Sequence, residues 1–301
     1  MSVTATATGA ADLCVKVGPV FFWSSQLILA IVLNVFLNAV LIGAYAARLA
    51  GVMTGRVGTS ISLFNLFVTF SRFANMFYAP MLGTISDRAS KVAVCVPASA
   101  AETTHLFEMQ MRAIILAGTL GNLIGALLLP TFAYMFVRGV GAFERRGSIP
   151  RALARLANPR VIADILRTVR LPSLDIFRRF RLRDVPTKLL VGNMLVTGIY
   201  AVGVVAAYLA SVIRPDVART ALSASGLVNG IATIAFALVV DPTSAYIVDQ
   251  AAKGERTLHD VKTMVVYLGL TAVVGTLASQ LILVPAALFI GGAAHLINAP
   301  R

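Results

Sequence analysis

Charged residues are scarce in this chain. Asp, Glu, Lys and Arg together make up 13 % of its 301 residues, whereas hydrophobic residues make up 58 %. A water-soluble domain carries about 25 % charged residues, so this chain has too little charge to cover a surface that faces water. The composition therefore excludes an ordinary soluble domain and predicts an integral membrane protein.

Cysteine and histidine are also rare, with two and three residues. Cys14 and Cys95 do not have the spacing of metal ligands, and the sequence leaves open whether they pair. The three histidines do not cluster, and no nucleophile lies next to a candidate base in the sequence. We therefore expect no metal, no cofactor and no enzymatic activity.

Long apolar segments recur along the chain. Each is long enough to cross the hydrocarbon layer of about 30 Å, which takes about 20 helical residues. The segments lack the alternating pattern of outer-membrane β-strands. The sequence thus predicts an all-α integral membrane protein with about six transmembrane helices, at Val20–Tyr45, Val57–Leu82, Ala113–Phe136, Leu189–Val212, Ala218–Val240 and Val261–Ile290.

The net charge of +13 is concentrated in one stretch between apolar segments. Residues 138–188 contain thirteen Lys or Arg against four Asp or Glu. Basic loops stay in the cytoplasm, beside anionic lipid headgroups. This distribution favours a membrane surface over nucleic acid as the partner of the basic loop, and it places both termini outside.

The basic loop has an amphipathic pattern of its own. After Asn158-Pro159, which is a good helix start, the apolar residues of 161–169 fall on one face. A similar piece follows at 176–183. The pattern predicts interfacial helices on the inner leaflet. We favour a membrane anchor, with a collector of substrate headgroups as the alternative.

Charge and hydropathy divide the chain into two halves of three helices each. Gly118-Thr119-Leu120 before Pro130 is similar to Gly275-Thr276-Leu277 before Pro285, which predicts an inverted repeat of the kind found in transporters. The predicted parts are an extracytoplasmic N-terminal segment (1–19), a first half (20–137), the cytoplasmic loop (138–188), a second half (189–290) and an extracytoplasmic tail (291–301).

The second apolar segment has a polar side. At 100° per residue, its polar residues fall within an arc of about 140°. An Arg at the centre of the bilayer costs at least ~2.5–3.5 kcal/mol, so something must offset the cost of Arg72. We predict that Arg72 binds a substrate phosphate in a hydrated cavity together with Asn65 and Asn75, with a structural ion pair as the alternative. The polar residues are Gly58, Ser62, Asn65, Thr69, Arg72 and Asn75.

Four charged residues are predicted at the cytoplasmic ends of the helices. Asp241-Pro242 is expected to end the fifth helix, with Asp249 just beyond it and with Arg48 and Arg56 at the same membrane level. We assign the two arginines as candidate substrate contacts. The two aspartates are candidates for a gate or for proton coupling, and salt bridges at helix ends are the alternative.

Several separate motifs resemble the Amj family of alternate lipid II flippases. In the first half these are Tyr45–Arg56, Ser62–Asn65 and Ser71–Pro80. The second half adds four more, Ile199–Gly203, Ser225–Thr233, Asp241-Pro242 and Gly275–Ala287. The resemblance covers about residues 27–290, but the loop at 143–185 matches only in being basic, and the start of the chain does not match.

The resemblance implies a flippase of the bacterial cytoplasmic membrane. Such a protein would move lipid II, the undecaprenyl-pyrophosphate-linked precursor of peptidoglycan, from the inner to the outer leaflet. Its expected partners are this lipid, anionic lipids at the basic loop and the machinery of cell-wall synthesis. Two alternatives remain open, namely a membrane enzyme acting on polyprenyl phosphates and a scaffold for cell-wall assembly that does not transport.

Overall fold

The computed structural model describes Cys14, residues 20–146 and residues 185–299, apart from the side chains of residues 67, 70–74, 145 and 146. The predicted interfacial helices of the basic loop lie outside these residues. Every regular element in the described part of the chain is helical, which confirms the all-α fold.

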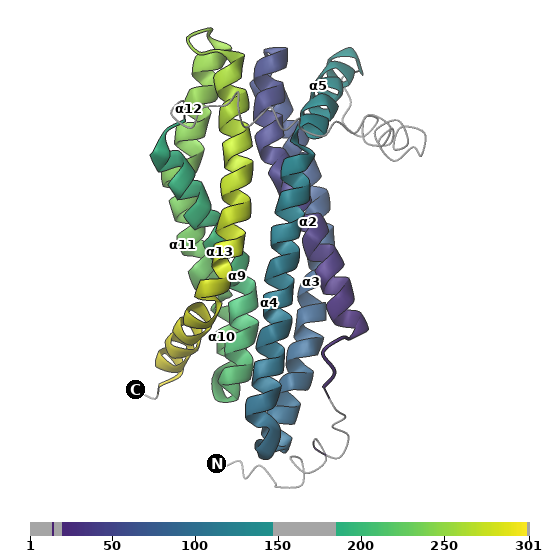
Figure 1. The fold of residues 1–301 in the computed structure, drawn as a ribbon, viewed down its shortest axis with the longest axis vertical. Helices are drawn as coiled ribbons and strands as arrows, with labels where there is room; N and C mark the ends of the chain where they lie inside the picture. Colours follow the sequence, from purple (N-terminus) through teal and green to yellow (C-terminus); the bar gives the residue numbers. More distant parts are fainter. Residues whose placement is uncertain (1–13, 15–19, 147–184, 300–301) are drawn as a thin grey trace, which may run out of the picture.

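The helices run as long rods along one axis (Figure 1). The two ends of the chain lie at one end of the bundle, and α5 and α12 lie at the other. The first group is α2 (Ser25–Thr54), α3 (Val57–Cys95), α4 (Ala100–Leu127) and α5 (Leu129–Arg146). The second is α9 (Thr187–Ile213), α10 (Ala218–Ser223), α11 (Ser225–Ala235), α12 (Asp241–Ala252) and α13 (Leu258–Asn298).

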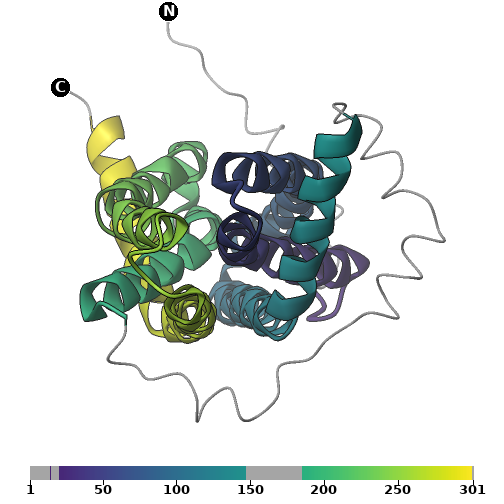
Figure 2. The same ribbon diagram turned by 90° about the horizontal axis from the view of Figure 1, so that it is seen from above.

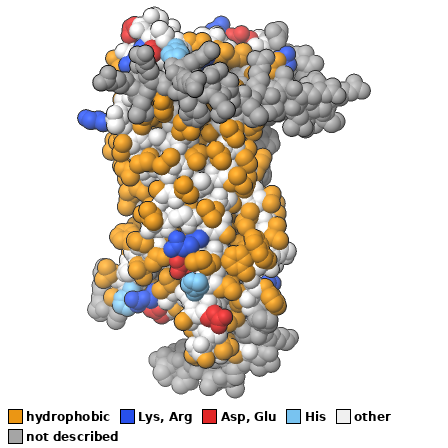
Figure 3. Space-filling view, in the orientation of Figure 1, with side chains coloured by type: hydrophobic (Ala, Val, Ile, Leu, Met, Phe, Trp, Pro, Cys, Tyr) orange, Lys and Arg blue, Asp and Glu red, His pale blue; other side chains and the backbone are white. Residues whose placement is uncertain are grey.

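Apolar side chains cover much of the surface of the bundle. Five helical stretches among the described residues are long and apolar enough to cross a membrane: Ser25–Thr54, Pro97–Leu127, Thr187–Ile213, Pro215–Ala252 and Leu258–Asn298. Hydrophobic side chains form a broad belt on the surface, and charged ones gather toward its ends (Figure 3). Such a belt is stable in lipid, where helices satisfy their own backbone groups.

The helices form two groups that pack side by side (Figure 2). Within each group, the first and third rods touch through glycine. A Cβ atom on Gly121 of α4 would lie 2.4 Å from the carbonyl oxygen of Val35 in α2. A Cβ atom on Gly275 of α13 would lie 2.2 Å from the carbonyl oxygen of Met194 in α9. Small residues at these points allow the backbones to approach closely. The inverted repeat itself stays a prediction.

Polar contacts between α4 and α13 join the two groups. Arg112 Nη1 donates to the carbonyl oxygen of Gln280 at 2.8 Å, and Gln280 Nε2 donates to the carbonyl oxygen of Arg112 at 3.0 Å. Closer to the end of α4, Asn122 Nδ2 donates to Thr276 Oγ1 at 3.3 Å. Partly buried polar groups are thus paired across the interface, as the interior of a membrane protein requires.

The predicted third segment, Ala113–Phe136, has the wrong limits. Helix α4 already begins at Ala100 and ends at Leu127, and α5 is a separate helix that starts at Leu129. Pro130 lies in the first turn of α5, where its missing N–H group does not matter. Within α4 the same residue would have interrupted the hydrogen-bond ladder. The proline therefore marks the junction between a membrane-crossing helix and an amphipathic one.

The prediction that Asp241-Pro242 ends the fifth helix is also wrong. The chain passes from α11 through a π-helical turn, Phe236–Val240, directly into α12. Pro242 lies in the first turn of α12 and is tolerated there. A π turn locally rearranges the hydrogen-bond ladder, so the rod continues past the proline. Asp241 consequently lies within the rod.

Two further helices are longer than predicted. Helix α3 continues past Pro80 to Cys95 and includes Asp87 and Arg88, which lie beyond the predicted limit at Leu82. Helix α13 continues to Asn298, through most of the predicted tail. In α3, the charged residues lowered the hydropathy without interrupting the helix.

A disulfide joins Cys14 to Cys95, with a Cα–Cα distance of 5.5 Å. Cys95 is the last residue of α3, at the end of the bundle where both ends of the chain lie (Figure 1). Disulfides persist in oxidising compartments and are rare in the cytoplasm. The bond therefore supports the orientation that the charge distribution predicted, with this end outside the cytoplasm.

Candidate functional site

The polar side of α3 is exposed. Ser62, Asn65, Thr69 and Asn75 all have exposed side chains, and α3 is one continuous helix, so they keep their predicted spacing. On the other side of the same helix, the ring of Phe64 packs edge-on against that of Phe136, with 6.3 Å between the centroids. The polar side consequently faces away from the packed interior.

The side chain of Arg72 lies outside the described part of the structure, although its backbone belongs to α3. Its binding role therefore stays a prediction, as do those of Asn65 and Asn75. At a rise of 1.5 Å per residue, the distance along the helix axis from Ser62 to Asn75 is about 20 Å. This is roughly two-thirds of a hydrocarbon layer of about 30 Å.

An ion pair joins the two groups of helices at the end opposite the disulfide. Arg48 of α2 donates through Nη2 to Asp241 Oδ1 at 2.5 Å and through Nη1 to Ser244 Oγ at 2.6 Å. The side chain of Arg48 is only 13 % exposed, whereas that of Asp241 is 54 % exposed. A mostly buried guanidinium thus reaches outward to a carboxylate on α12. Ser244 was not singled out in the sequence.

A second polar contact lies one turn deeper along α2. The hydroxyl of Tyr45 donates to Asn193 Oδ1 of α9 at 2.8 Å. Asn193 Nδ2 donates in turn to the carbonyl oxygen of Leu268 and to Thr271 Oγ1, both in α13, at 3.0 and 2.9 Å. The structure thus places Asn193 at a point where three helices meet.

Arg56 and Asp249, the other two residues predicted at the cytoplasmic ends of the helices, are not part of this contact. Arg56 pairs with Glu144 of α5 at 2.7 Å, and both side chains are about half exposed. Asp249 is exposed on α12, and none of the ion pairs among the described residues includes it. Glu144 was missed because the sequence placed it in the basic loop.

The described residues contain no cluster of three His, Cys, Asp or Glu side chains that could hold a metal ion.

The apolar belt and the helical rods define a multi-pass helical membrane protein. Residues 33–294 match the family model described as Amj, alternate to MurJ. The chain is 36 % identical over 248 residues to a Bacillus subtilis (strain 168) protein named lipid II flippase Amj, an alignment that covers 82 % of this chain and 88 % of that one. The chain belongs to the Amj family. No solved structure matches it.

Proposed function

We propose that this chain is a lipid II flippase that moves the lipid-linked peptidoglycan precursor from the inner to the outer leaflet. The proposal rests chiefly on its 36 % identity, across most of both chains, to a protein of that name. The exposed polar side of α3 adds a physical reason, because it offers a headgroup a route along the surface of the bundle.

A lipid flippase must carry a polar headgroup past the hydrocarbon layer while the tail stays in it. Exposed Ser62, Asn65, Thr69 and Asn75 provide hydrogen-bonding groups over about 20 Å of helix. The route is open at the side, so a polyprenyl tail can remain in lipid throughout. An enclosed channel would force the tail to enter it together with the headgroup.

Arg72 is the proposed phosphate-binding residue on this route, with Asn65 and Asn75 as hydrogen-bonding neighbours. It lies ten residues after Ser62 and three before Asn75, and thus within the polar side. The planar guanidinium can bind two phosphate oxygens at once, which favours Arg over Lys. A pyrophosphate passing Arg72 would also offset the cost of a cation at this depth.

The ion pair of Arg48 with Asp241 is the proposed cytoplasmic gate. When formed, it holds α2 against α12, and release of the pair would free both charges. Arg48 could then bind the entering pyrophosphate, with Arg56 as a second contact. Asp249 and the released Asp241 remain candidates for proton coupling.

The proposal also includes the orientation of the protein in the membrane and its partners. The basic loop at 138–188 faces the cytoplasm and binds anionic lipids, and both termini face outward. Enzymes of cell-wall synthesis are candidate partners on either side. We propose that the chain moves its substrate without altering it and is therefore not an enzyme.

A headgroup-accessibility assay tests these statements together. Purified protein is reconstituted with lipid II in vesicles, and arrival of the headgroup on the far side is followed with an impermeant reagent. Translocation with chemically unchanged lipid is the expected result. A modified lipid would mean an enzyme, and neither translocation nor modification would mean a scaffold. Vesicles without protein provide the background rate.

A further inference from the structure

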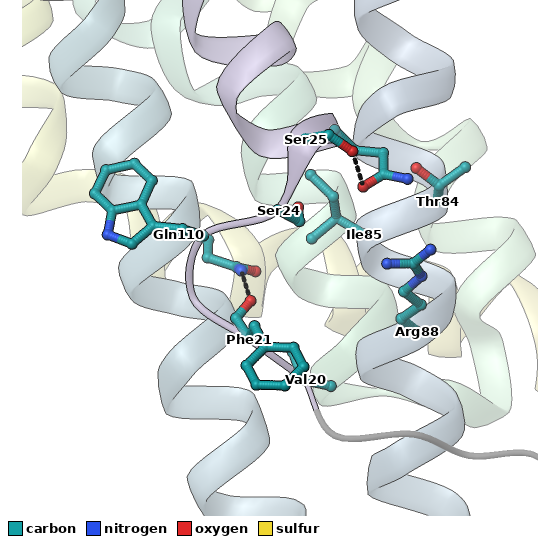
Figure 4. A pocket seen from close by; sticks show the side chains of 10 residues that line it. Val20, Phe21, Ser24, Ser25, Thr84, Ile85, Arg88 and Gln110 are labelled. Carbon is teal, nitrogen blue, oxygen red and sulfur yellow. Dashed lines mark hydrogen bonds between the residues drawn. The ribbon is translucent and has the colours of Figure 1, made fainter.

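A pocket opens where the start of α2 meets α3 and α4, at the end of the bundle that holds the disulfide (Figure 4). Its volume is about 280 Å³. The wall consists of residues 20, 21 and 23–26, of Thr84, Ile85 and Arg88 from α3, and of Gln110 from α4. None of these residues belongs to the polar side of α3 or to the cytoplasmic ion pairs, so the pocket is a separate site.

Gln110 provides a buried acceptor at this pocket. Its side chain is fully buried, and Nε2 donates to the carbonyl oxygens of Phe21 and Phe22 at 3.2 and 2.8 Å (Figure 4 shows the first bond). These two acceptors fix the orientation of the amide, because a flipped amide would turn Oε1 against both carbonyl oxygens. Oε1 is buried and has no hydrogen-bond partner among the residues that the structure describes. Such a group is costly to leave unpaired, so it calls for a donor on the occupant of the pocket.

Positive charge lines the opposite wall. Arg88 extends from α3 toward the start of α2 (Figure 4). The first amides of α2, those of Ser25 and Gln26, have no acceptor within the helix, whereas the amide of Leu27 is already bonded to Ser24 Oγ at 3.2 Å. Free amides at the positive end of a long helix bind phosphate well, and a nearby guanidinium strengthens the binding.

Two exposed rings complete the pocket. Phe21 and Trp23 are 70 % and 64 % exposed, and both line the wall. Aromatic rings present apolar faces on which a sugar ring can pack. The volume is close to the lower limit of about 300 Å³ for small-molecule sites. The pocket is thus large enough for one sugar with its phosphate.

We infer that this pocket binds a glycosyl phosphate on the extracytoplasmic side. Arg88 and the amides of Ser25 and Gln26 bind the phosphate, and a hydroxyl or acetamido N–H group of the sugar donates to Gln110 Oε1. The inference rests on the proposed function and deepens it, because the headgroup of a flipped lipid would present its phosphate and first sugar at this end. The same chemistry occurs in free sugar phosphates, so the test has one arm for each source.

Trp23 gives a direct readout, since it is the only tryptophan in the chain. Purified full-length protein in detergent is titrated with N-acetylglucosamine 1-phosphate at pH 8, and its tryptophan emission is recorded. We expect a saturable change that Arg88→Gln weakens about tenfold to a hundredfold, the effect of losing one charge-assisted contact. Lys91→Gln is the matched control, because it removes the same charge from an exposed site on α3 that does not line the pocket.

A second ligand tests the role of Gln110. Methyl phosphate at pH 8 carries the charge but has no hydrogen to donate, so it should bind about two- to tenfold more weakly than the sugar phosphate. Equal affinities would overturn the assignment of a sugar. No saturable signal with either compound, or equal weakening by Arg88→Gln and Lys91→Gln, would overturn the site altogether.

The lipid arm uses lipid II in mixed micelles as a competitor of the soluble sugar phosphate. Displacement assigns the site to the flipped headgroup, and failure to displace overturns that assignment. Reconstituted vesicles then separate the inference from the proposed function. Binding at Trp23 in a protein that does not translocate lipid II would refute only the flippase, whereas translocation without binding would refute only the pocket.

Discussion

Arg48 and Asp241 lie 193 residues apart in the sequence and meet at 2.5 Å, which fastens α2 to α12. Arg48 is the more buried partner, with 13 % of its side chain exposed against 54 % for Asp241. Removal of the carboxylate therefore leaves a mostly buried cation, whereas removal of the cation leaves a carboxylate that water can reach.

This asymmetry predicts unequal effects of the two neutral substitutions. Asp241→Asn should destabilise the protein by about 1–3 kcal/mol, because a buried charge loses its partner. The reversal Asp241→Arg should be worse, and the swapped pair Arg48→Asp with Asp241→Arg should recover both thermal stability and translocation. Thermal unfolding in detergent and the vesicle assay measure the two properties.

Arg56 and Glu144 provide the matched control, since they form an ion pair on an exposed surface. Exposed pairs contribute about 0–1 kcal/mol, so Glu144→Gln should change little. If Glu144→Gln proved as harmful as Asp241→Asn, or if the swapped pair gave no recovery, the gate at Arg48 would be refuted.

Substitutions at Arg72 test the phosphate-binding role. Arg72→Ala should abolish translocation, and Arg72→Lys should weaken it in part, because it keeps the charge and loses the planar fork. Arg72→Gln should fold at least as well as the original protein, because it removes a costly charge from the membrane. The initial rate of headgroup translocation and the yield of folded protein are measured side by side.

One pattern would contradict this role. If Arg72→Gln translocated lipid II normally but aggregated or disappeared from the membrane, Arg72 would be a structural ion-pair partner. The polar side of α3 would then need another cation to serve as the phosphate site.

The glycine contact between α9 and α13 predicts a packing defect. A methyl group at Gly275 would lie 2.2 Å from the carbonyl oxygen of Met194, so Gly275→Ala must push the helices apart. Overpacking of this kind costs about 1–3 kcal/mol. Gly230→Ala is the control, because its added methyl group meets nothing within 4 Å. A thermal scan showing equal stabilities for the two variants would disprove the close contact.

Cysteine labelling tests the orientation. In a Cys14→Ser variant, Cys95 should react with an impermeant maleimide in intact cells, because the predicted orientation places the end of α3 outside. In a variant without native cysteines, Ser148→Cys in the basic loop should not react. Labelling of Ser148→Cys in intact cells would show that the protein has the opposite orientation.

The sequence predicted the all-α membrane class because hydropathy reports it directly, whereas the predicted number of about six transmembrane helices stays a prediction. It misplaced the ends of helices where polar residues or a proline lie within a continuous helix. Asp87 and Arg88 lowered the hydropathy of α3 but are compatible with a helix, so the helix continued to Cys95. Pro242 suggested an end because the sequence does not reveal the π turn that precedes it.

The candidate site was predictable only in part for a similar reason. A single helix carries its own periodicity, so the polar side of α3 could be found from the sequence alone. Contacts between distant helices depend on rotation and packing. That is why Tyr45 with Asn193, and Arg56 with Glu144, were missed. Gln110 was missed because it lay outside the predicted apolar segments, where a polar residue is expected.

The disulfide turns the first two helices into a closed covalent ring. Cys14 and Cys95, 81 positions apart, enclose all of α2 and α3 together with the short turn at Gly55 and Arg56. If a protease cut this turn, the disulfide would still join the two fragments. They would migrate together on a gel until a reductant breaks the bond. Cleavage at this turn thus yields no free fragment as long as the disulfide stays oxidised.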